Sequence, residues 1–374
     1  MKEISRAVGA AEGRLLKRLR AVVEVESPSE DKAGVDRAGA LVAGWAAGLG
    51  GKVKRHKQKA AGDVLEIQFG AGGRSRVMLL THLDTVWPMG TLKKMPWRET
   101  GGKIYGPGIL DMKAGVVMAL EAIAALQQLG EMRPVTLLLN SDEEVGSTVS
   151  RLVTEKLARE CAAVFVLEPA QVLAYKTARK GVGQFDLRVE GVAAHSGVDF
   201  EQGHSAVLEM ARLVEKISRF TDLRRGITVN AGVIAGGTRS NVVAAECRCE
   251  VDVRIAKATD AARVEKMFRA LKVTDKACKL TVSGGINRPP MERKPGTVAL
   301  FLKARTLAAE MGFVLDEAAT GGGSDGNFTA ALGIPTLDGM GAVGAGAHAA
   351  HEHVVKKHLV ERTALLAGMM AAVN

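Results

Sequence analysis

Two short runs of consecutive apolar residues constrain the fold of this chain more than any other feature. "VTLLLN" at 135–140 and "AAVFVLE" at 162–168 are apolar on successive positions rather than on alternate ones. Strands of this kind are buried on both faces, which is typical of parallel sheets covered by helices on either side. Further apolar runs and helical patterns continue the alternation of strand and helix, at 4–24, 33–49, 64–69, 76–80 and 113–130. We therefore predict an α/β domain whose mixed sheet has helices on both faces.

The pattern changes near residue 180, where apolar and polar residues begin to alternate. "GQFDLRVEG", "ITVNAGVIAGG" and "CRCEVDVRI" alternate in this way, and helical patterns at 203–220 and 259–271 accompany them. Alternation predicts a small antiparallel sheet with one solvated face and one face covered by the two helices. The first pattern resumes after "NRPP" at 287–290. We predict one domain formed by 1–178 and 290–374, with an α+β domain inserted at 179–289.

Charge, apolar run length and cysteine spacing narrow the class of function. The net charge is +10, but the basic residues are scattered among acidic ones without interleaved aromatics, so we predict no nucleic-acid binding and an anionic small-molecule substrate. No apolar stretch approaches the ~20 residues that span a bilayer, and the first residues lack the pattern of a secretory signal. We therefore expect a cytoplasmic protein with no membrane partner. The four cysteines lack the paired spacing of a zinc knuckle.

Polar residues stand where the apolar runs end, which is where open α/β sheets place their ligand sites. His82 in "LLTHLDTV" follows one run, and Asp84 lies two residues later, where a carboxylate can accept the second ring N–H of a metal-binding histidine. The other members of this group are carboxylates that follow later elements: Asp111, Asp142, Glu143, Glu144 and Glu168.

Each of these residues also has an ordinary structural explanation. Asp111 can cap a helix, the acidic run 142–144 can begin one, and His82 or Glu168 can simply end a strand. Adjacent carboxylates are nevertheless costly unless a cation binds them or they point apart. Together, nitrogen and oxygen donors without a thiolate match the ligands of two divalent cations.

Eight short motifs, in order along nearly the whole chain, resemble those of the two-zinc amidohydrolases and metallopeptidases. They are "THLDTV", "GPGILDMKAG", "SDEEVGS", "LEP", "GVAAHSG", "GGTRSN", "GGGSDGNF" and "GAHAAHE". This family includes carboxypeptidase G-type glutamate carboxypeptidases, acetylornithine deacetylase, succinyl-diaminopimelate desuccinylase and aminoacylase, and this chain is most similar to the carboxypeptidase G branch. The resemblance implies a zinc exopeptidase-like catalytic domain, an inserted ferredoxin-like lid and dimerisation domain, and a homodimer formed through that insert.

The resemblance assigns two zinc ions per subunit to particular ligands. One zinc would be bound by His82 and Glu168 and the other by Glu144 and His348, with Asp111 bridging them. Cobalt or manganese would also suit these donors.

The histidine-rich segment "GAGAHAAHEHVVKKH" contributes a single expected ligand. His348 fits the family motif, and His351 is the alternative to it. Glu352 matches the family's spacing from that histidine, and we expect it to support or cap the last helix.

The resemblance also implies catalytic roles. Glu143 would act as the general base that takes a proton from the attacking water and returns it to the leaving amine. Asp84 would orient His82, and His195 in "GVAAHSG" would donate to the oxyanion, in relatives from the partner subunit. The family further implies a cis peptide after Asp111.

Candidates for substrate binding lie in the insert and in the segment that follows it. Arginine suits a carboxylate because its guanidinium binds both oxygens, and "GGGSDGNF" offers backbone N–H groups. The candidates are Asn241, Arg254, Arg288, Gly322 and Gly323.

We therefore expect a zinc-dependent hydrolase that cleaves the amide bond of an N-acyl or peptidyl amino acid with a free carboxylate. Its substrate would be an N-acyl amino acid, a glutamyl peptide or a folate-like conjugate, with glutamate preferred. The alternative is a biosynthetic deacylase of the acetylornithine or succinyl-diaminopimelate type. A non-catalytic relative that binds metal or peptide is less favoured, because the full set of ligands and the base is present.

Overall fold

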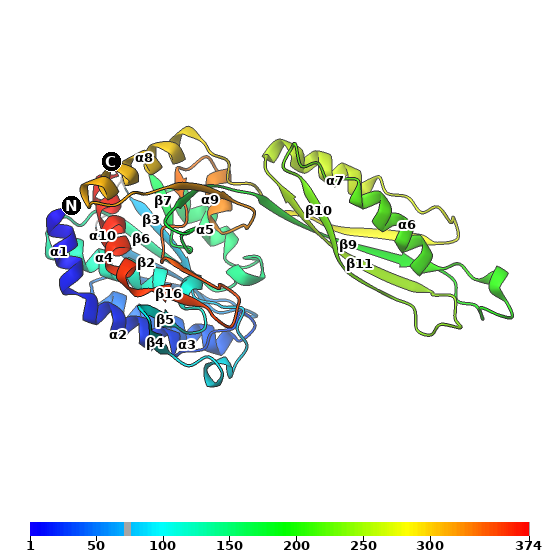
Figure 1. Cartoon of the computed structure of the whole chain (residues 1–374), viewed down its shortest axis with the longest axis horizontal. Coiled ribbons are helices and arrows are strands. Elements are labelled where there is room, and N and C mark those ends of the chain that lie inside the picture. Colours follow the sequence, from blue (N-terminus) through cyan, green and yellow to red (C-terminus); the bar gives the residue numbers. More distant parts are fainter. Residues whose placement is uncertain (71–75, 374) are drawn as a thin grey trace. The chain divides into compact units, whose positions relative to one another are not determined.

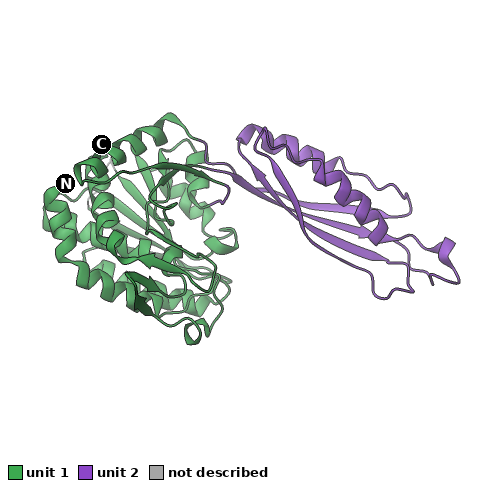
Figure 2. Ribbon diagram, viewed as in Figure 1, with its two compact units in different colours: residues 1–178, 293–320, 324–374 green, residues 179–292, 321–323 purple. Residues whose placement is uncertain are grey.

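A computed structural model describes residues 1–70 and 76–373 of the chain. The chain forms two compact units, which Figure 2 draws in green and purple. Unit 1 comprises Met1–Ala178, Arg293–Thr320 and Ser324–Asn374, and unit 2 comprises Arg179–Glu292 and Gly321–Gly323. Unit 2 thus contains a three-residue glycine segment that lies far from its main part in the sequence.

Unit 1 is built on a six-stranded sheet in which four adjacent strands are parallel (Figure 1). Its strands in spatial order are β1 (Lys52–His56), β2 (Val64–Phe69), β6 (Val135–Asn140), β3 (Val77–His82), β7 (Ala163–Val166) and β14 (Thr336–Leu337). β6, β3, β7 and β14 run parallel, whereas β2 is antiparallel to β6 and β1 is antiparallel to β2. The predicted mixed sheet in an α/β unit is confirmed.

The central strands are apolar on successive positions because helices cover both faces of the sheet. In β3, Val77 and Leu79 pack into one core with α4 and α10, and Met78 and Leu80 pack into another core with α5. The helices of unit 1 are α1 (Lys2–Ala10), α2 (Glu12–Val23), α3 (Lys32–Gly48), α4 (Ala114–Gln128), α5 (Arg151–Ala158), α8 (Pro295–Glu310), α9 (Gly326–Ala331) and α10 (Lys356–Ala372).

The N-terminal segment differs from the single helix that its periodicity predicts over 4–24. The helix breaks at Ala11, whose φ of −95° and ψ of 3° separate α1 from α2. After this break, Arg14 and Arg18 of α2 pair with the buried Glu121 of α4, with N–O distances of 2.6 and 2.8 Å.

Two smaller sheets and three short helical turns complete unit 1. β15 (Gly344–Ala345), β16 (His353–Val355), β5 (Lys103–Tyr105) and β4 (Arg98–Thr100) form one sheet in that order, and β8 (Tyr175–Arg179) pairs with β13 (Glu317–Thr320). The turns are η1 (Thr91–Lys93), η2 (Ile109–Lys113) and η3 (Glu143–Val145).

Unit 2 is an antiparallel sheet with two helices on one face. The strands lie in the order β10 (Thr228–Gly236), β11 (Glu246–Ile255), β9 (Gly181–Glu190) and β12 (Lys279–Arg288). The two inner strands alternate buried side chains with half-buried or exposed ones, because α6 (Ala206–Ser218) and α7 (Ala261–Arg269) cover one face. Short turns η4 (Phe200–Gln202) and η5 (Ala258–Asp260) lie between these elements. Within the described residues, no helix of either unit has the length and apolar character needed to cross a membrane.

Candidate active site

The carboxyl ends of three neighbouring strands bring the predicted polar residues of unit 1 to one edge of the sheet. β3 ends at His82, β6 ends at Asn140 just before η3, and Glu168 lies two residues beyond the end of β7. Because β6, β3 and β7 are adjacent and parallel, their ends meet at the same edge.

Asp111 lies between two histidines that come from opposite ends of the chain. Its Oδ1 is 3.2 Å from Nε2 of His82, and its Oδ2 is 3.4 Å from Nε2 of His348. Glu168 Oε1 is 3.5 Å from the same nitrogen of His82, and Glu144 Oε2 is 3.2 Å from that of His348. Each histidine therefore has a carboxylate of its own and shares Asp111 with the other.

The ring of His82 is oriented by the residue that follows two positions later. Its Nδ1 lies 2.9 Å from the backbone carbonyl of Asp84 and 3.4 Å from the carboxylate Oδ1 of the same residue. The nearer acceptor is therefore the backbone carbonyl, whereas the sequence predicts the carboxylate. Donation from Nδ1 leaves Nε2 as the ligand nitrogen facing Asp111 and Glu168.

The carboxylate of Asp84 instead fixes the loop that carries the two adjacent glutamates. Its Oδ1 accepts the backbone N–H of Glu143 and its Oδ2 that of Glu144, both at 3.1 Å. Oδ2 also accepts the hydroxyl of Ser29 at 2.7 Å. Asp84 is fully buried, so these bonds compensate for the loss of hydration of its charge.

The site has an excess of negative charge that shifts the pKa values of both histidines. Hydrogen bonds with Asp111 and Glu144 raise the pKa of His348 to about 10. Burial opposes the charged form of His82, but contacts with Asp111, Asp84 and Glu168 outweigh it and hold its pKa well above the ordinary value. Burial and the neighbouring charge of Asp111 raise the pKa of Glu144.

These donors fit divalent cations. The ligand atoms of His82, Asp111 and Glu144 all lie within 4.8 Å of one another, and so do those of His82, Glu143 and Glu168. Within the described residues, Oε1 of Glu144 is buried without a hydrogen-bond partner, which is costly for a carboxylate unless a cation binds it. Imidazole and carboxylate without thiolate suit zinc, cobalt or manganese.

The C-terminal histidine segment places its four histidines in different surroundings. His348 has a left-handed φ of 62°, a conformation that is uncommon for a residue with a side chain and that occurs at functional sites. His351 is exposed, His353 is buried against Tyr105, and His358 lies 3.3 Å from Glu361.

The expected role of Glu352 is wrong, whereas the expected cis peptide after Asp111 is present. Glu352 does not cap the last helix: α10 begins after Val355 without a side-chain cap, and the carboxylate of Glu352 binds backbone N–H groups near Asp111. The Asp111–Met112 peptide is cis, as the family resemblance implies.

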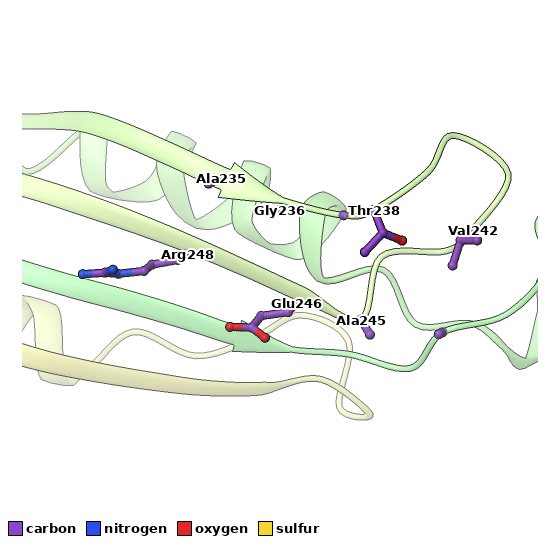
Figure 3. A pocket seen from close by; sticks show the side chains of 9 residues that line it. Ala235, Gly236, Thr238, Val242, Ala245, Glu246 and Arg248 are labelled. Atoms are coloured by element: carbon purple, nitrogen blue, oxygen red, sulfur yellow. The ribbon is translucent and has the colours of Figure 1, made fainter.

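The remaining candidates lie in unit 2, on two adjacent loops and on its strands. The N–H of Ser196 donates to the carbonyl of Asn241 at 3.0 Å, so that His195 and Asn241 lie on neighbouring segments. Both side chains are exposed. Figure 3 shows a cavity beside this loop, between the end of β10 and the start of β11, lined in part by Thr238, Val242 and Arg248.

The arginine and glycine candidates have partners within unit 2. Arg254 forms a two-pronged pair with Asp252, both N–O distances being 2.8 Å, and Arg288 is buried at the end of β12. The carbonyls of Gly322 and Gly323 accept hydrogen bonds from Arg179, at 3.2 and 3.0 Å. Sequence reasoning missed Arg179, although a basic residue at the predicted domain junction was a signal for it.

Similarity to known proteins extends over most of the chain. A family model described as peptidase family M20/M25/M40 matches residues 78–372. Carboxypeptidase G2 from Pseudomonas sp. (strain RS-16) is 30% identical over 345 residues, which cover 89% of this chain and 83% of that protein. Acetylornithine deacetylase from Myxococcus xanthus is 27% identical over 223 residues, covering 56% and 58% of the two chains.

Solved structures are similar over nearly the full length. An aminopeptidase PepT from Bacillus cereus matches with a TM-score of 0.80 at 22% identity, covering 97% of this chain and 98% of that one. An M20 family metallo-carboxypeptidase from Sulfolobus solfataricus matches with a TM-score of 0.76 at 16% identity, covering 96% and 98%. At these identities the likeness is one of fold.

Proposed function

Since the chain belongs to peptidase family M20/M25/M40 and is therefore a metal-dependent hydrolase, we propose that it cleaves the amide bond of an N-acyl or peptidyl amino acid with a free C-terminal carboxylate. The observation that carries this proposal is the cluster of His82, Asp111, Glu144, Glu168 and His348 at the strand ends of unit 1.

His82 and Glu168 would hold one metal ion and Glu144 and His348 the other, with Asp111 between them. The pairing of each histidine with its own carboxylate and with one oxygen of Asp111 supports this division. When bound, two zinc ions would polarise the scissile carbonyl and acidify the attacking water.

Glu143 would move the proton. Its carboxylate lies within 4.8 Å of the donor atoms of His82 and Glu168, and Asp84 fixes its backbone N–H. A carboxylate so placed takes a proton from the water as it attacks the carbonyl carbon. It then returns that proton to the nitrogen of the leaving amine, which departs with its bonding pair as the C–N bond breaks.

His195 would stabilise the oxyanion of the tetrahedral state. The N–H of Gly197 donates to its Nδ1 at 3.1 Å, so in the neutral ring the proton lies on Nε2. This tautomer presents a donor from an exposed side chain, which is what a developing oxyanion requires.

Glutamate is the proposed C-terminal residue, and Arg288 its proposed carboxylate partner. The 30% identity to carboxypeptidase G2 of Pseudomonas over 89% of the chain supports this choice, as does the net charge of +10. The similarity to acetylornithine deacetylase of Myxococcus xanthus favours a second candidate, a biosynthetic N-acyl-amino-acid deacylase.

A substrate panel tests the proposal. We expect the highest kcat/KM for N-acyl glutamates, glutamyl dipeptides or folate-like conjugates, with turnover lost on chelation and restored by zinc or cobalt. Arg288→Ala should raise KM roughly 10- to 150-fold for substrates with a free carboxylate, because a charged hydrogen bond contributes ~1.5–3 kcal/mol. It should change KM little for the matching amides.

Arg248→Ala is the control, because Arg248 lies in the same sheet, on β11, and is paired with Asp186 at 2.6 Å. That variant should leave KM unchanged. Preference for N-acetylornithine or N-succinyl-diaminopimelate would favour the deacylase instead, and equal effects of Arg288→Ala on acids and amides would remove Arg288 from the carboxylate site.

A further inference from the structure

Glu352 is a buried carboxylate whose two oxygens are both fully engaged. Oε1 accepts the backbone N–H groups of Leu110 and Asp111, at 2.8 and 3.1 Å. Oε2 accepts the backbone N–H of Gly108 at 2.9 Å and the indole N–H of Trp87 at 2.7 Å. The side chain is fully buried, so these four bonds replace its hydration.

Three of the four donors belong to the short segment that presents Asp111. This segment, Gly108–Asp111, lies between β5 and α4, and the backbone of its last residue, Asp111, has non-helical angles within η2. The carboxylate of Glu352 therefore supplies the acceptors that a regular element would otherwise provide.

The main chain of Glu352 is connected by hydrogen-bonded turns to His348, the second histidine of the site. Two successive turns connect it to His348: the N–H of Ala349 donates to Gly346, and the N–H of Glu352 donates to Ala349, both at 2.8 Å. Immediately after Glu352, β16 pairs with β5 through His353 and Tyr105. The segment from His348 to Glu352 is thus fixed at both ends.

We propose that Glu352 is a positioning residue that holds Asp111 and His348 in one fixed arrangement. This inference rests on the proposed function, since those two residues are ligands only if the site binds metal. Glu352 touches neither the metal nor the substrate in this proposal. It acts by fixing the backbone of one ligand segment while belonging to the turn of the other.

Glu352→Gln is the sharpest test, because the amide has the same shape as the carboxylate. Whichever way the amide is turned, its NH2 group faces two N–H groups. An NH2 group is itself a donor and cannot accept their hydrogen bonds. We expect the affinity for Zn²⁺, measured by competition with a chromophoric chelator, to fall about 10–100-fold, as is typical when support for a metal ligand is removed. The visible spectrum of the Co²⁺-loaded protein should change, and kcat should fall with little change in KM.

Glu209→Gln is the matched control. Glu209 is also a buried carboxylate that accepts two backbone N–H groups, those of Thr274 and Asp275, but it lies in unit 2. We expect Glu209→Gln to lower Tm while leaving Zn²⁺ affinity and the Co²⁺ spectrum of the folded protein unchanged. Loss of stability alone would therefore not reproduce the effect of Glu352→Gln.

Trp87→Phe provides a milder variant should Glu352→Gln fail to fold. It removes one of the four donors and leaves the backbone bonds in place, so Zn²⁺ affinity should fall by a few-fold. Wild-type Zn²⁺ affinity and Co²⁺ spectrum in folded Glu352→Gln, or in Trp87→Phe where the glutamine variant does not fold, would overturn the proposal. If instead the wild-type protein binds no metal, the proposed function itself is wrong. That result differs from wild-type affinity in the variants, which would refute only the positioning role of Glu352.

Discussion

Glu143 and Glu144 are neighbours in the sequence, but their carboxylates face different surroundings. Glu144 lies 3.2 Å from Nε2 of His348, whereas the donor atom of Glu143 groups with those of His82 and Glu168. Asp84 holds the two backbone N–H groups on its two oxygens. The two carboxylates thus have different partners besides His82, which allows one to be a ligand and the other a base.

Replacing Glu143 should separate metal binding from turnover. We expect Glu143→Gln to lower kcat at least ~100-fold, because the amide cannot take the proton from the attacking water. The metal content of the purified variant, measured by plasma mass spectrometry, should stay at the wild-type value.

Glu144→Gln is the companion variant, and it should lose metal as well as activity. A Glu143→Gln protein that turns over at the wild-type rate would refute the assignment of the base. A Glu144→Gln protein with full metal content would remove Glu144 from the ligand set.

A site residue can be predicted from the sequence when the residues next to it show an unusual pattern. His82 and Glu168 end apolar runs, and Asp111 follows a Gly-Pro-Gly turn, so each stands out in the sequence and the structure brings all three together. The contacts of Glu352 could not be predicted in this way. Its carboxylate binds the backbone N–H groups of residues more than 240 positions away in the sequence. Nearly every amino acid has a backbone N–H group, so the identity of those residues does not indicate the contact.

At the scale of whole elements, strands were easier to predict than the ends of helices. β6 lies at Val135–Asn140, as its apolar run predicts, because burial on both faces requires an unbroken run. The break between α1 and α2 at Ala11 was not predicted. Both helices bury residues at helical spacing, so the periodicity continues through the break, and only Gly9 and Gly13 hint at it.

The attachment of α6 to the segment before β12 should depend on pH. Glu209 of α6 accepts the backbone N–H groups of Thr274 and Asp275 and pairs with Arg212 at 3.1 Å. Burial opposes its ionised form, but these bonds outweigh it and lower its pKa from the ordinary 4.5. A lowered pKa in the folded state means that the contribution to stability is present above pH 4.5 and is lost as the pH falls through the folded value.

We therefore expect Glu209→Gln to destabilise the protein by about 1–3 kcal/mol near neutral pH, because two buried donors lose a charged acceptor. The difference in Tm between wild type and variant, measured by scanning calorimetry, should shrink as the pH is lowered below about 4.5. A difference that stays constant down to pH 3 would show that the charge of Glu209 does not contribute.

At the scale of the whole molecule, unit 2 carries a feature that supports the homodimer implied by the family resemblance, which we propose here. β10 is an edge strand of its sheet, and Val233 and Ile234 on it are 53% and 56% exposed. Val207 and Leu208 at the start of α6 are also exposed. An open edge with apolar side chains is a template for pairing with another strand, and a second copy of the chain would cover it.

A charge on this edge should prevent the proposed dimer. By light scattering coupled to gel filtration, we expect wild type to be a dimer and Ile234→Lys to be a monomer. Leu152→Lys, which alters a more exposed apolar residue of α5 in unit 1, serves as the control and should stay dimeric. A dimeric Ile234→Lys protein would move the interface elsewhere.

The same assembly decides whether His195 acts within one subunit or across two. Glu143→Gln and His195→Ala are each expected to be inactive. If His195 serves the partner subunit, unfolding and refolding the two together should restore about a quarter of the wild-type rate, because half of the dimers are mixed and each has one intact site. No recovery would mean that His195 serves its own subunit.

The glycine segment Gly321–Gly323 has a consequence for anyone who recombines this protein with its relatives. Because it clusters with unit 2 and its carbonyls bind Arg179, the unit is not a single contiguous cassette. In a chimaera that exchanges only residues 179–292, residue 179 would come from the relative, whereas the glycine carbonyls that it contacts would come from this protein. A chimaera that exchanges the whole of unit 2 therefore needs four crossovers. Two of them flank residues 179–292, and the other two flank residues 321–323.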